Sequence, residues 1–361
     1  MPDSAASEPV LKRANTEFGA VALALSSRRK ALAAFLEMAG WGEVAPVPLA
    51  ADASFRCYYR LIRGAESAVV MDAPPPQEDI GPYVAVAAML RDLGLSAPVV
   101  LAEDPVNGFL LIEDFGDSTY TRLVQRGADE RSLYALAIDV LVALHRAIIV
   151  AGEPELPPYD DERLLDEAAL FVDWYMTAVL GGPLSFALRE EYLALWRAVL
   201  PLATDPFRPT LVLRDFHIDN LMLLSDREGV RRCGLLDFQD AVIGPPAYDL
   251  VSLLEDARRD VPEVLRQAMI ARYLAAFPSF ERANFERAAV ILAVQRNCKI
   301  LGIFTRLWKR DGKPVYLGHI PRLWRLIEHD LRHPDLGGIA RWFDRHLPPD
   351  TRRVPGLQRT I

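Results

Sequence analysis

The sequence predicts an α+β fold in which a small β-rich region precedes a larger, mainly helical one. Short runs with strand character alternate with turn residues up to about residue 115, and longer stretches with helical periodicity dominate beyond it. The chain has 361 residues, of which 51% are hydrophobic and 25% charged, as expected for a folded protein with two domains or two lobes. We expect a flexible extension over 1–25, an N-lobe over 26–113 and a C-lobe over 114–361.

The elements expected in the β-rich region follow one another with clear turn signals. They are a helix over 28–41, a hairpin of strands over 54–62 and 67–73, a helix over 80–93, and a strand pair over 99–104 and 108–116. Gly64 marks the turn of the hairpin, and Asn107-Gly108 marks the turn of the strand pair. These elements together predict a small sheet with one internal helix.

Long helical stretches characterise the rest of the chain. Apolar or amphipathic periodicity predicts helices over 132–149, 161–176 and 188–200, and helices resume from 248 to about 331. A strand-rich segment over 211–238 interrupts them.

Composition argues against several kinds of partner and compartment. The net charge of −8 disfavours nucleic-acid binding, and three widely spaced cysteines without a CxxC pair disfavour a disulfide framework or a zinc site. The apolar run over 18–27 follows Glu17 and precedes Arg28-Arg29-Lys30, which are the wrong flanks for an export signal. No run approaches the ~18 apolar residues of a membrane span. We therefore expect a cytoplasmic protein with a small-molecule partner and no membrane association.

One polar insertion within an apolar region carries the chemistry. The stretch LVLRDFHIDNLMLL over 211–224 contains Asp215 and Asn220, and Asp237 follows in GLLDFQD after a polar turn. We expect NLMLL and CGLLDF to form an antiparallel hairpin, which would place Asn220 beside Asp237 with Asp215 nearby on the loop.

These residue types suit phosphoryl transfer. Mg²⁺ takes hard oxygen ligands, usually one or two from the protein and the rest from phosphate and water, and Asn220 and Asp237 offer such oxygens. Asp215 is placed to orient a substrate hydroxyl and to accept its proton as the γ-phosphoryl group leaves ATP.

The motifs resemble the aminoglycoside phosphotransferase family, a branch of the protein-kinase-like fold. The match is closest to a subgroup, the anomeric kinases of N-acetylmuramate and N-acetylglucosamine used in bacterial cell-wall recycling. The shared segments are ADASFRCYYR (51–60), VVMDAPP (69–75), LIEDFGD (111–117), RDFHIDNLM (214–222), GLLDFQDAVIGPPAYDLVSLLEDARRD (234–260) and QRNCKILGIF (295–304). The resemblance implies a two-lobed fold and transfer of phosphate from ATP, with Mg²⁺, to the C1 hydroxyl of an amino sugar.

The same resemblance assigns roles to individual residues. It makes Asp215 the catalytic base and Asn220 and Asp237 the Mg²⁺ ligands. The remaining assignments are the hairpin residues Ser54, Phe55 and Arg56 at the ATP phosphates, the linker residues Glu113 and Phe115 at the adenine edge, and His217 and Asp249 as structural supports. For His217, a loop-stabilising hydrogen bond to the backbone competes with metal ligation, and the bond is favoured.

Three positions depart from the broader kinase pattern. Leu213 stands where many kinases have a histidine, and Ala51 stands where the family tends to have glycine. Met71 stands where the kinase fold places a strand lysine against the ATP phosphates. Neutralisation of phosphate charge would then fall to Mg²⁺, with Arg56 or Arg60 as candidates.

The acceptor is expected to bind the helical region, where the sequence is less specific. Candidate contacts are Gln295, Arg296, Lys299, Arg306 and Tyr316. A carboxylated sugar such as N-acetylmuramate would favour a cationic group, whereas a polycationic aminoglycoside would favour carboxylates. The alternative is that the charged residues form a solvated helix face and the aromatic residues belong to the core.

Other functions remain open at this point. The acceptor could be an aminoglycoside, choline or another small alcohol. The missing lysine could mark a catalytically dead nucleotide-binding scaffold, and the D-x-H pattern at Asp215 could mark a metal-dependent phosphoesterase. The sequence indicates neither the preferred sugar nor the oligomeric state.

Overall fold

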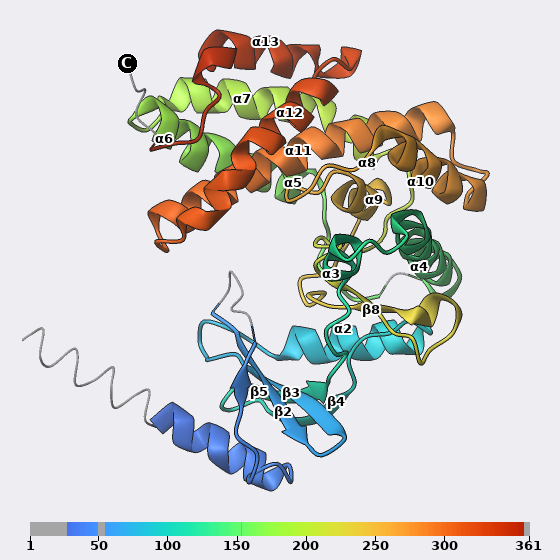
Figure 1. Cartoon of the computed structure of the whole chain (residues 1–361). Helices are drawn as coiled ribbons and strands as arrows, with labels where there is room; N and C mark the ends of the chain where they lie inside the picture. The colour runs from blue at the N-terminus through green and yellow to red at the C-terminus, as the bar shows by residue number, and fades with distance from the viewer. Residues whose placement is uncertain (1–26, 50–54, 153, 357–361) are drawn as a thin grey trace, which may run out of the picture. The chain divides into compact units, whose positions relative to one another are not determined.

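The computed structural model describes residues 27–49, 55–152 and 154–356, which form two compact units (Figure 1). The first unit comprises the chain up to Ala85 together with Pro98–Asp114, and the second comprises Val86–Ala97 and the chain from Phe115 onward. The first is β-rich and the second mainly helical, so the predicted α+β fold is confirmed. The predicted extension over 1–25 lies outside the described residues.

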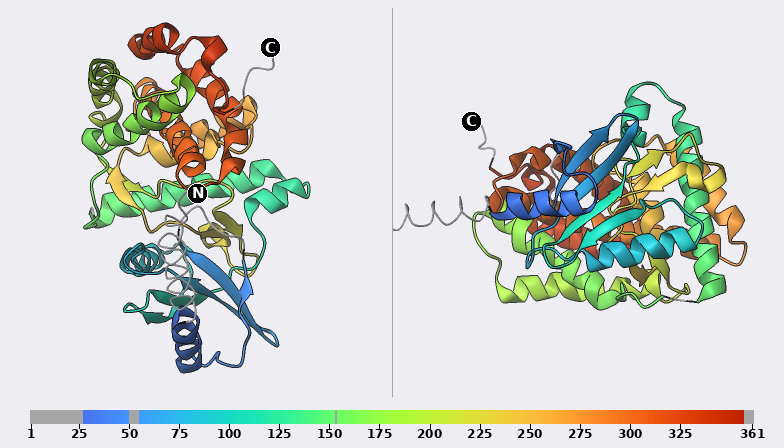
Figure 2. Two further views of the ribbon diagram at one scale, coloured as in Figure 1. Left: turned by 90° about the vertical axis from the view of Figure 1, so that its left-hand side faces the viewer. Right: turned by 90° about the horizontal axis from the view of Figure 1, so that it is seen from below.

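A five-stranded antiparallel sheet forms the first unit, with strand order β1-β2-β3-β5-β4. Its strands are β1 (Val47–Pro48), β2 (Cys57–Arg63), β3 (Glu66–Asp72), β4 (Val100–Asp104) and β5 (Phe109–Glu113). Gly64 has φ +60°, a conformation that glycine adopts without steric cost, and it allows the tight turn that pairs Arg63 with Glu66. Both views in Figure 2 show these strands side by side in one sheet.

One face of this sheet packs against the helical segment over 27–38. Alternate strand residues meet the helix because side chains of period two share a face. The buried cluster consists of Phe35, Leu36, Trp41, Leu61, Ala68, Val70, Phe109 and Leu111. Arg28 fixes the start of the helix, since its Nε donates to Asp72 Oδ1 at 2.9 Å and its guanidinium lies 4.2 Å from the Phe109 ring centroid.

Helix α2 (Gly81–Asp92) is followed by a segment that joins the second unit. Ser96 forms an isolated bridge with Gly234, and the carbonyl of Ser96 accepts the N–H of Leu235 at 2.7 Å. Through these backbone bonds to Gly234 and Leu235, the segment Val86–Ala97 belongs to the second compact unit although it lies within the N-terminal part of the sequence.

The second unit contains two short sheets among many helices. Strands β6 (Thr210–Val212) and β9 (Val242–Gly244) pair antiparallel, as do β7 (Leu221–Leu223) and β8 (Cys233–Leu235). The longer helical elements are α3 (Tyr120–Gln125), α4 (Glu130–Ala151), α5 (Asp161–Leu170), η1 (Phe171–Met176), α7 (Phe186–Val199), α9 (Ala247–Leu254), α10 (Glu263–Ala276), α11 (Arg282–Lys309), η3 (Pro314–His319), α12 (Ile320–Asp330) and α13 (Gly337–His346). The expected hairpin of NLMLL with CGLLDF is thus present, whereas β9 and α13 were not anticipated.

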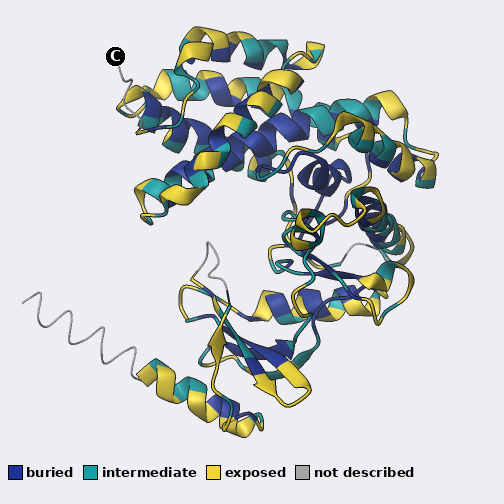
Figure 3. Cartoon of the chain, in the orientation of Figure 1, coloured by how far each residue is buried: buried dark blue, intermediate teal, exposed yellow. Residues whose placement is uncertain are grey.

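The core of the second unit is built around α11, which packs against α5, η1, α9 and α12 (Figure 3). By length and composition alone, two described helices, α4 and α11, could cross a membrane. Both helices contain charged residues, so neither is the uninterrupted apolar run considered from the sequence. Half of the apolar window of α4 and 78% of that of α11 are buried inside the protein, as in core helices.

Candidate active site

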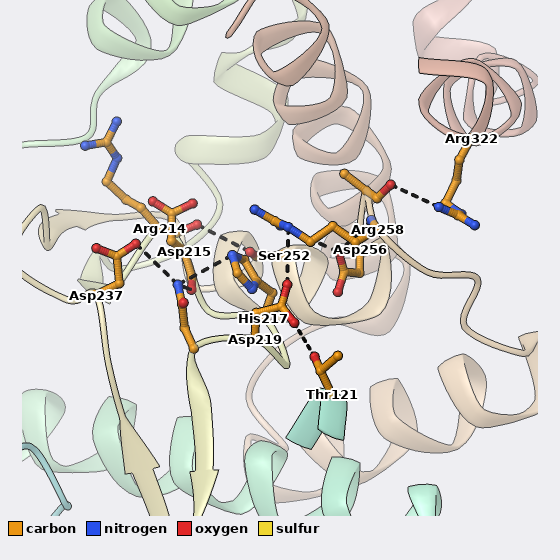
Figure 4. A network of polar contacts seen from close by, with 12 residues as sticks. Thr121, Arg214, Asp215, His217, Asp219, Asp237, Ser252, Asp256, Arg258 and Arg322 are labelled. Atoms are coloured by element: carbon orange, nitrogen blue, oxygen red, sulfur yellow. Dashed lines mark hydrogen bonds and ion pairs between the residues drawn. The ribbon is translucent and has the colours of Figure 1, made fainter. Parts of the chain in front are cut away.

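The loop between β6 and β7 is held at both ends by backbone pairing. At its start, Val212 pairs with Val242 of β9, and at its end Leu221 pairs with Leu235 of β8. The loop has no regular secondary structure, so side chains and individual backbone bonds fix its shape (Figure 4). These two sheets therefore fix where the polar residues of the loop lie.

Asp249 holds the first part of the loop through the backbone. Its Oδ2 accepts the N–H of Leu213 at 2.6 Å, and its Oδ1 accepts the N–H of Arg214 at 2.9 Å. The side chain is fully buried in the first turn of α9, and burial raises the pKa of Asp249 to about 7 although the two N–H donors favour the ionised form. The supporting role of Asp249 stays a prediction, and these two bonds are the contacts through which it would act.

Asn220 and Asp237 lie side by side. Asn220 Nδ2 donates to the carbonyl oxygen of Asp215 at 3.0 Å and lies 3.4 Å from Asp237 Oδ2. The other oxygen of Asp237 accepts Gln239 Nε2 at 2.8 Å. The backbone also joins the two strands here, because the N–H of Leu236 donates to the carbonyl of Asn220 at 2.9 Å.

This arrangement suits a magnesium ion. The carbonyl of Asp215 holds the amide nitrogen of Asn220, which leaves Oδ1 of Asn220 to ligate a cation beside the carboxylate of Asp237. Within the described ranges, no group of three or more His, Cys, Asp or Glu residues could hold a metal ion. An ion held by only two protein ligands needs phosphate and water to complete its coordination. Mg²⁺ is usually bound in this way, whereas structural zinc takes four protein ligands.

His217 is a buried, neutral member of the loop. Burial lowers the pKa of its imidazole well below the usual value, and the nearby Arg258 and Arg296 lower it further. Its Nε2 lies 3.4 Å from Asn220 Nδ2, and Nδ1 has no hydrogen-bond partner in the part of the chain that the structure describes. The ring therefore meets Asn220 directly, and the described residues show no backbone bond of the kind the sequence suggested.

A second polar network joins Asp219 of the loop to two other elements, and the sequence did not single it out. Figure 4 shows Asp219 between Thr121 and Arg258. The hydroxyl of Thr121 donates to Asp219, and Arg258 Nε lies 3.3 Å from Asp219 Oδ2. The backbone N–H of Arg258 donates to Asp256 at 2.8 Å. The segment LLEDARRD was part of the shared motifs, but its spacing does not indicate that it meets the loop.

In the first unit, two of the predicted nucleotide-binding residues, Phe55 and Arg56, contact Glu78. The N–H of Phe55 donates to Glu78 Oε1 at 3.1 Å, and Arg56 Nε lies 3.4 Å from Glu78 Oε2. Ser54 lies outside the described residues. Met71 is buried in β3, and Arg60 forms an ion pair with Asp114 at 2.8 Å.

The linker residues are held in different ways. Glu113 ends β5, and its Oε2 accepts the N–H of Val99 at 3.2 Å. Phe115 packs so closely against Gly234 that a Cβ there would lie 2.7 Å from its ring, and Arg227 lies 5.0 Å from the ring centroid. Position 234 thus requires glycine to accommodate Phe115.

The five residues predicted to bind the acceptor do not form one exposed face. Gln295, Arg296 and Lys299 are buried, whereas Arg306 and Tyr316 are half-buried. Gln295 Nε2 donates to the carbonyl of Leu164 at 2.8 Å, and Lys299 Nζ lies 2.9 Å from Glu167 Oε2. The ring of Tyr316 stacks on Phe304 at 5.3 Å, and burial lowers the pKa of Arg306.

Comparison with known proteins adds to this geometry. A family model described as "Phosphotransferase enzyme family" matches residues 46–286. The chain belongs to this family. An N-acetylmuramate/N-acetylglucosamine kinase of Caulobacter vibrioides is 40% identical over 367 residues, covering 92% of this chain and 100% of that protein. A protein of the same name from Pseudomonas aeruginosa is 43% identical over 318 residues, which cover 83% of this chain and 89% of the relative.

Solved structures of other phosphotransferases share the fold. A choline/ethanolamine kinase family protein from Mesorhizobium loti has a TM-score of 0.57 and 17% identity, with 88% of this chain and 97% of that chain covered. The ADP-bound aminoglycoside phosphotransferase APH(2'')-Ib has a TM-score of 0.53 and 17% identity, with 79% and 94% covered. These structures confirm the kinase-like fold predicted from the motifs, and the family model and the relatives confirm the family.

Proposed function

We propose that this family member is a cytoplasmic, ATP- and Mg²⁺-dependent kinase that phosphorylates the C1 hydroxyl of N-acetylmuramate, N-acetylglucosamine or both in cell-wall recycling. The placement of Asn220 beside Asp237, on the carbonyl of Asp215, is the observation that carries the proposal. The relatives named for these two sugars support the choice of acceptor.

Each residue of the site has a task in this reaction. Asp215 accepts the proton of the sugar hydroxyl as its oxygen attacks the γ-phosphorus, the bond to the β-phosphate oxygen breaks, and ADP leaves. An anomeric hydroxyl is more acidic than an ordinary alcohol, so a carboxylate is an adequate base. Asn220 and Asp237 would hold Mg²⁺, which supplies charge neutralisation at the phosphates when bound.

The test is an acceptor panel with radiolabelled ATP. We expect ADP formation with N-acetylmuramate and N-acetylglucosamine, and phosphorus NMR of the product should locate the phosphate at C1. The methyl glycoside of N-acetylglucosamine, which has no free C1 hydroxyl, should give no product. If the protein phosphorylated an aminoglycoside or choline but neither amino sugar, the proposed acceptor would be wrong. If it consumed no ATP with any acceptor, the catalytically dead nucleotide-binding scaffold would be favoured.

Asp215→Asn tests the assigned base. Removing a general base should lower turnover by about 10³-fold or more while leaving ATP binding in place. Asp226→Asn, in the exposed turn after β7, is the matched control and should retain activity. Full activity of Asp215→Asn would exclude that residue as the base.

A further inference from the structure

A buried charge cluster lies directly behind the catalytic loop. Glu167 of α5 forms ion pairs with two cations, because its Oε1 accepts Arg214 Nη2 and its Oε2 lies 2.9 Å from Lys299 Nζ of α11. Tyr159 donates its hydroxyl hydrogen to the same carboxylate. The side chains of Arg214, Glu167 and Lys299 are between 11% and 14% exposed, so water screens these contacts little.

Two aromatic rings enclose the cations. The Tyr159 and Tyr248 rings meet edge to face at 4.9 Å, and Lys299 Nζ lies 5.9 Å from each centroid. Arg214 lies 5.5 Å from the Tyr159 centroid. Burial alone would raise the pKa of Glu167, but Lys299 and Arg214 outweigh it and hold the pKa below the usual value. The carboxylate is therefore ionised and serves both cations.

Arg214 needs such support because its backbone is strained. Its φ is +70°, in the left-handed region that residues with side chains seldom adopt. Such a conformation persists only where surrounding contacts over-determine it. The N–H of Arg214 donates to Asp249, its carbonyl accepts Ser252 Oγ at 3.3 Å, and its guanidinium binds Glu167.

We propose that Glu167 is a positioning residue for the catalytic base. Glu167 holds Arg214 in its strained backbone conformation. Because Asp215 follows Arg214 directly, the backbone conformation of Arg214 sets the direction in which the Asp215 side chain points. Lys299 and Tyr159 orient Glu167 by occupying its second oxygen. We call Glu167, Lys299 and Tyr159, which together hold Arg214, the loop anchor. This inference rests on the function proposed above, and it assigns Lys299 to the loop anchor instead of to acceptor binding.

The charges of the cluster predict an order of effects. Glu167→Gln leaves Arg214 and Lys299 buried close together without a carboxylate between them, which is a costly arrangement. Lys299→Met removes one cation and leaves a matched pair of Glu167 and Arg214. Combining the two substitutions relieves the repulsion that Glu167→Gln creates, so the double variant should melt at a higher temperature than Glu167→Gln alone.

The experiment measures kinetics and hydrogen exchange on the full chain. Glu167→Gln should lower kcat by about 100-fold, as expected for a misplaced catalytic group, with KM for ATP within about two-fold of wild type. Amides over 213–217 should exchange faster with deuterium. Asp166→Asn, at the exposed neighbouring position of α5, should change neither quantity. Lys299→Met should lower kcat and speed amide exchange in the same way, but by less. Lys299→Arg, which keeps the positive charge, should have kcat and exchange rates close to wild type.

Two outcomes would overturn the anchor. One is unchanged exchange over 213–217 in both Glu167→Gln and Lys299→Met. The other is a Lys299→Met variant whose KM for the sugar rises while kcat and loop exchange stay at wild-type values, which would return Lys299 to the acceptor. Hydrogen exchange needs no substrate, so it decides the anchor even if the wild-type protein phosphorylates neither amino sugar.

Discussion

Arg214 and Asp237 are the two non-glycine residues with positive φ in the described part of the chain, at +70° and +56°. One directly precedes the proposed base, and the other is a proposed metal ligand. Residues in sparsely populated backbone regions cost on the order of 1–3 kcal/mol each and cluster at functional sites. Here the strained backbone at Arg214 and Asp237 sets the directions of two carboxylates, those of Asp215 and Asp237. Both residues lie in loops whose ends pair in short sheets.

Asp237→Asn should separate the fold from metal binding. Asparagine tolerates the left-handed conformation about as well as aspartate, so the melting temperature should change by no more than about 2 °C. The amide is a poorer Mg²⁺ ligand, so the Mg²⁺ concentration for half-maximal rate should rise at least about ten-fold, with a fall in kcat of about 10²-fold. A magnesium titration of initial rates measures both.

Asp240→Asn is the matched control for that variant. Asp240 follows three residues later and is exposed, so its substitution should leave the Mg²⁺ dependence unchanged. An Asp237→Asn protein with the wild-type Mg²⁺ dependence would remove Asp237 from the metal site.

Asp249→Asn should weaken the loop from the α9 side. An asparagine can accept with only one oxygen, so one of the N–H groups of Leu213 and Arg214 would face an amide nitrogen. At pH 8, where the Asp249 carboxylate is mostly ionised, loss of a buried bond to this charged group costs about 2–3 kcal/mol, which urea unfolding would measure. Ser252→Ala removes a hydrogen bond between two neutral groups, the Ser252 hydroxyl and the carbonyl of Arg214, and should cost only about 1 kcal/mol. Equal losses in the two variants would contradict this ranking.

Local patterns were sufficient for much of the site. The turn between NLMLL and CGLLDF placed Asn220 beside Asp237, because a hairpin fixes its own register. The pairing of β6 with β9 could not be read in this way, since three-residue strands carry too little periodicity. Nor could the bond between Glu167 and Arg214, because 47 residues separate them and only the packed helices bring them together.

The interior of α11 shows the same limit. Gln295, Arg296 and Lys299 are polar, so sequence reasoning placed them at the acceptor, yet all three are buried. Gln295 and Lys299 bond to α5, through the carbonyl of Leu164 and the carboxylate of Glu167. A single sequence does not distinguish a polar residue that serves a ligand from one that joins two helices.

Gly302 shows where helix packing overrides helix propensity. A Cβ at this position of α11 would overlap the backbone carbonyl of Leu170 at the end of α5. Alanine would gain about 1 kcal/mol of helix propensity, but separating two backbones should cost about 3 kcal/mol. We expect Gly302→Ala to lower the free energy of unfolding by about 2 kcal/mol. Gly318→Ala, with no atom within 4 Å of the new Cβ, should be close to neutral, and a stabilised Gly302→Ala would refute the close contact.

A pair of buried carboxyl groups predicts how stability depends on pH. Asp330 ends α12 and forms a hydrogen bond with Glu255, which also binds Arg266 at 2.9 Å and Asn297 at 3.2 Å. Burial raises the pKa of Asp330 to about 9, and the charge of Glu255 adds to the rise. The folded protein therefore keeps a proton that the unfolded chain loses near pH 4.

The sign of the effect follows from this difference. Because the folded-state pKa is raised, the stabilisation is fully present below about pH 4 and is lost as the pH rises toward about 9, with a slope of at most about 1.4 kcal/mol per pH unit. Asp330→Asn keeps a donor for Glu255 without a charge, so it should flatten this slope and exceed wild-type stability at pH 8. Glu328→Gln, at an exposed position of α12, should keep the wild-type slope. Urea unfolding from pH 5 to 9 would measure all three proteins, and parallel curves for Asp330→Asn and wild type would show that Asp330 is ionised in the fold.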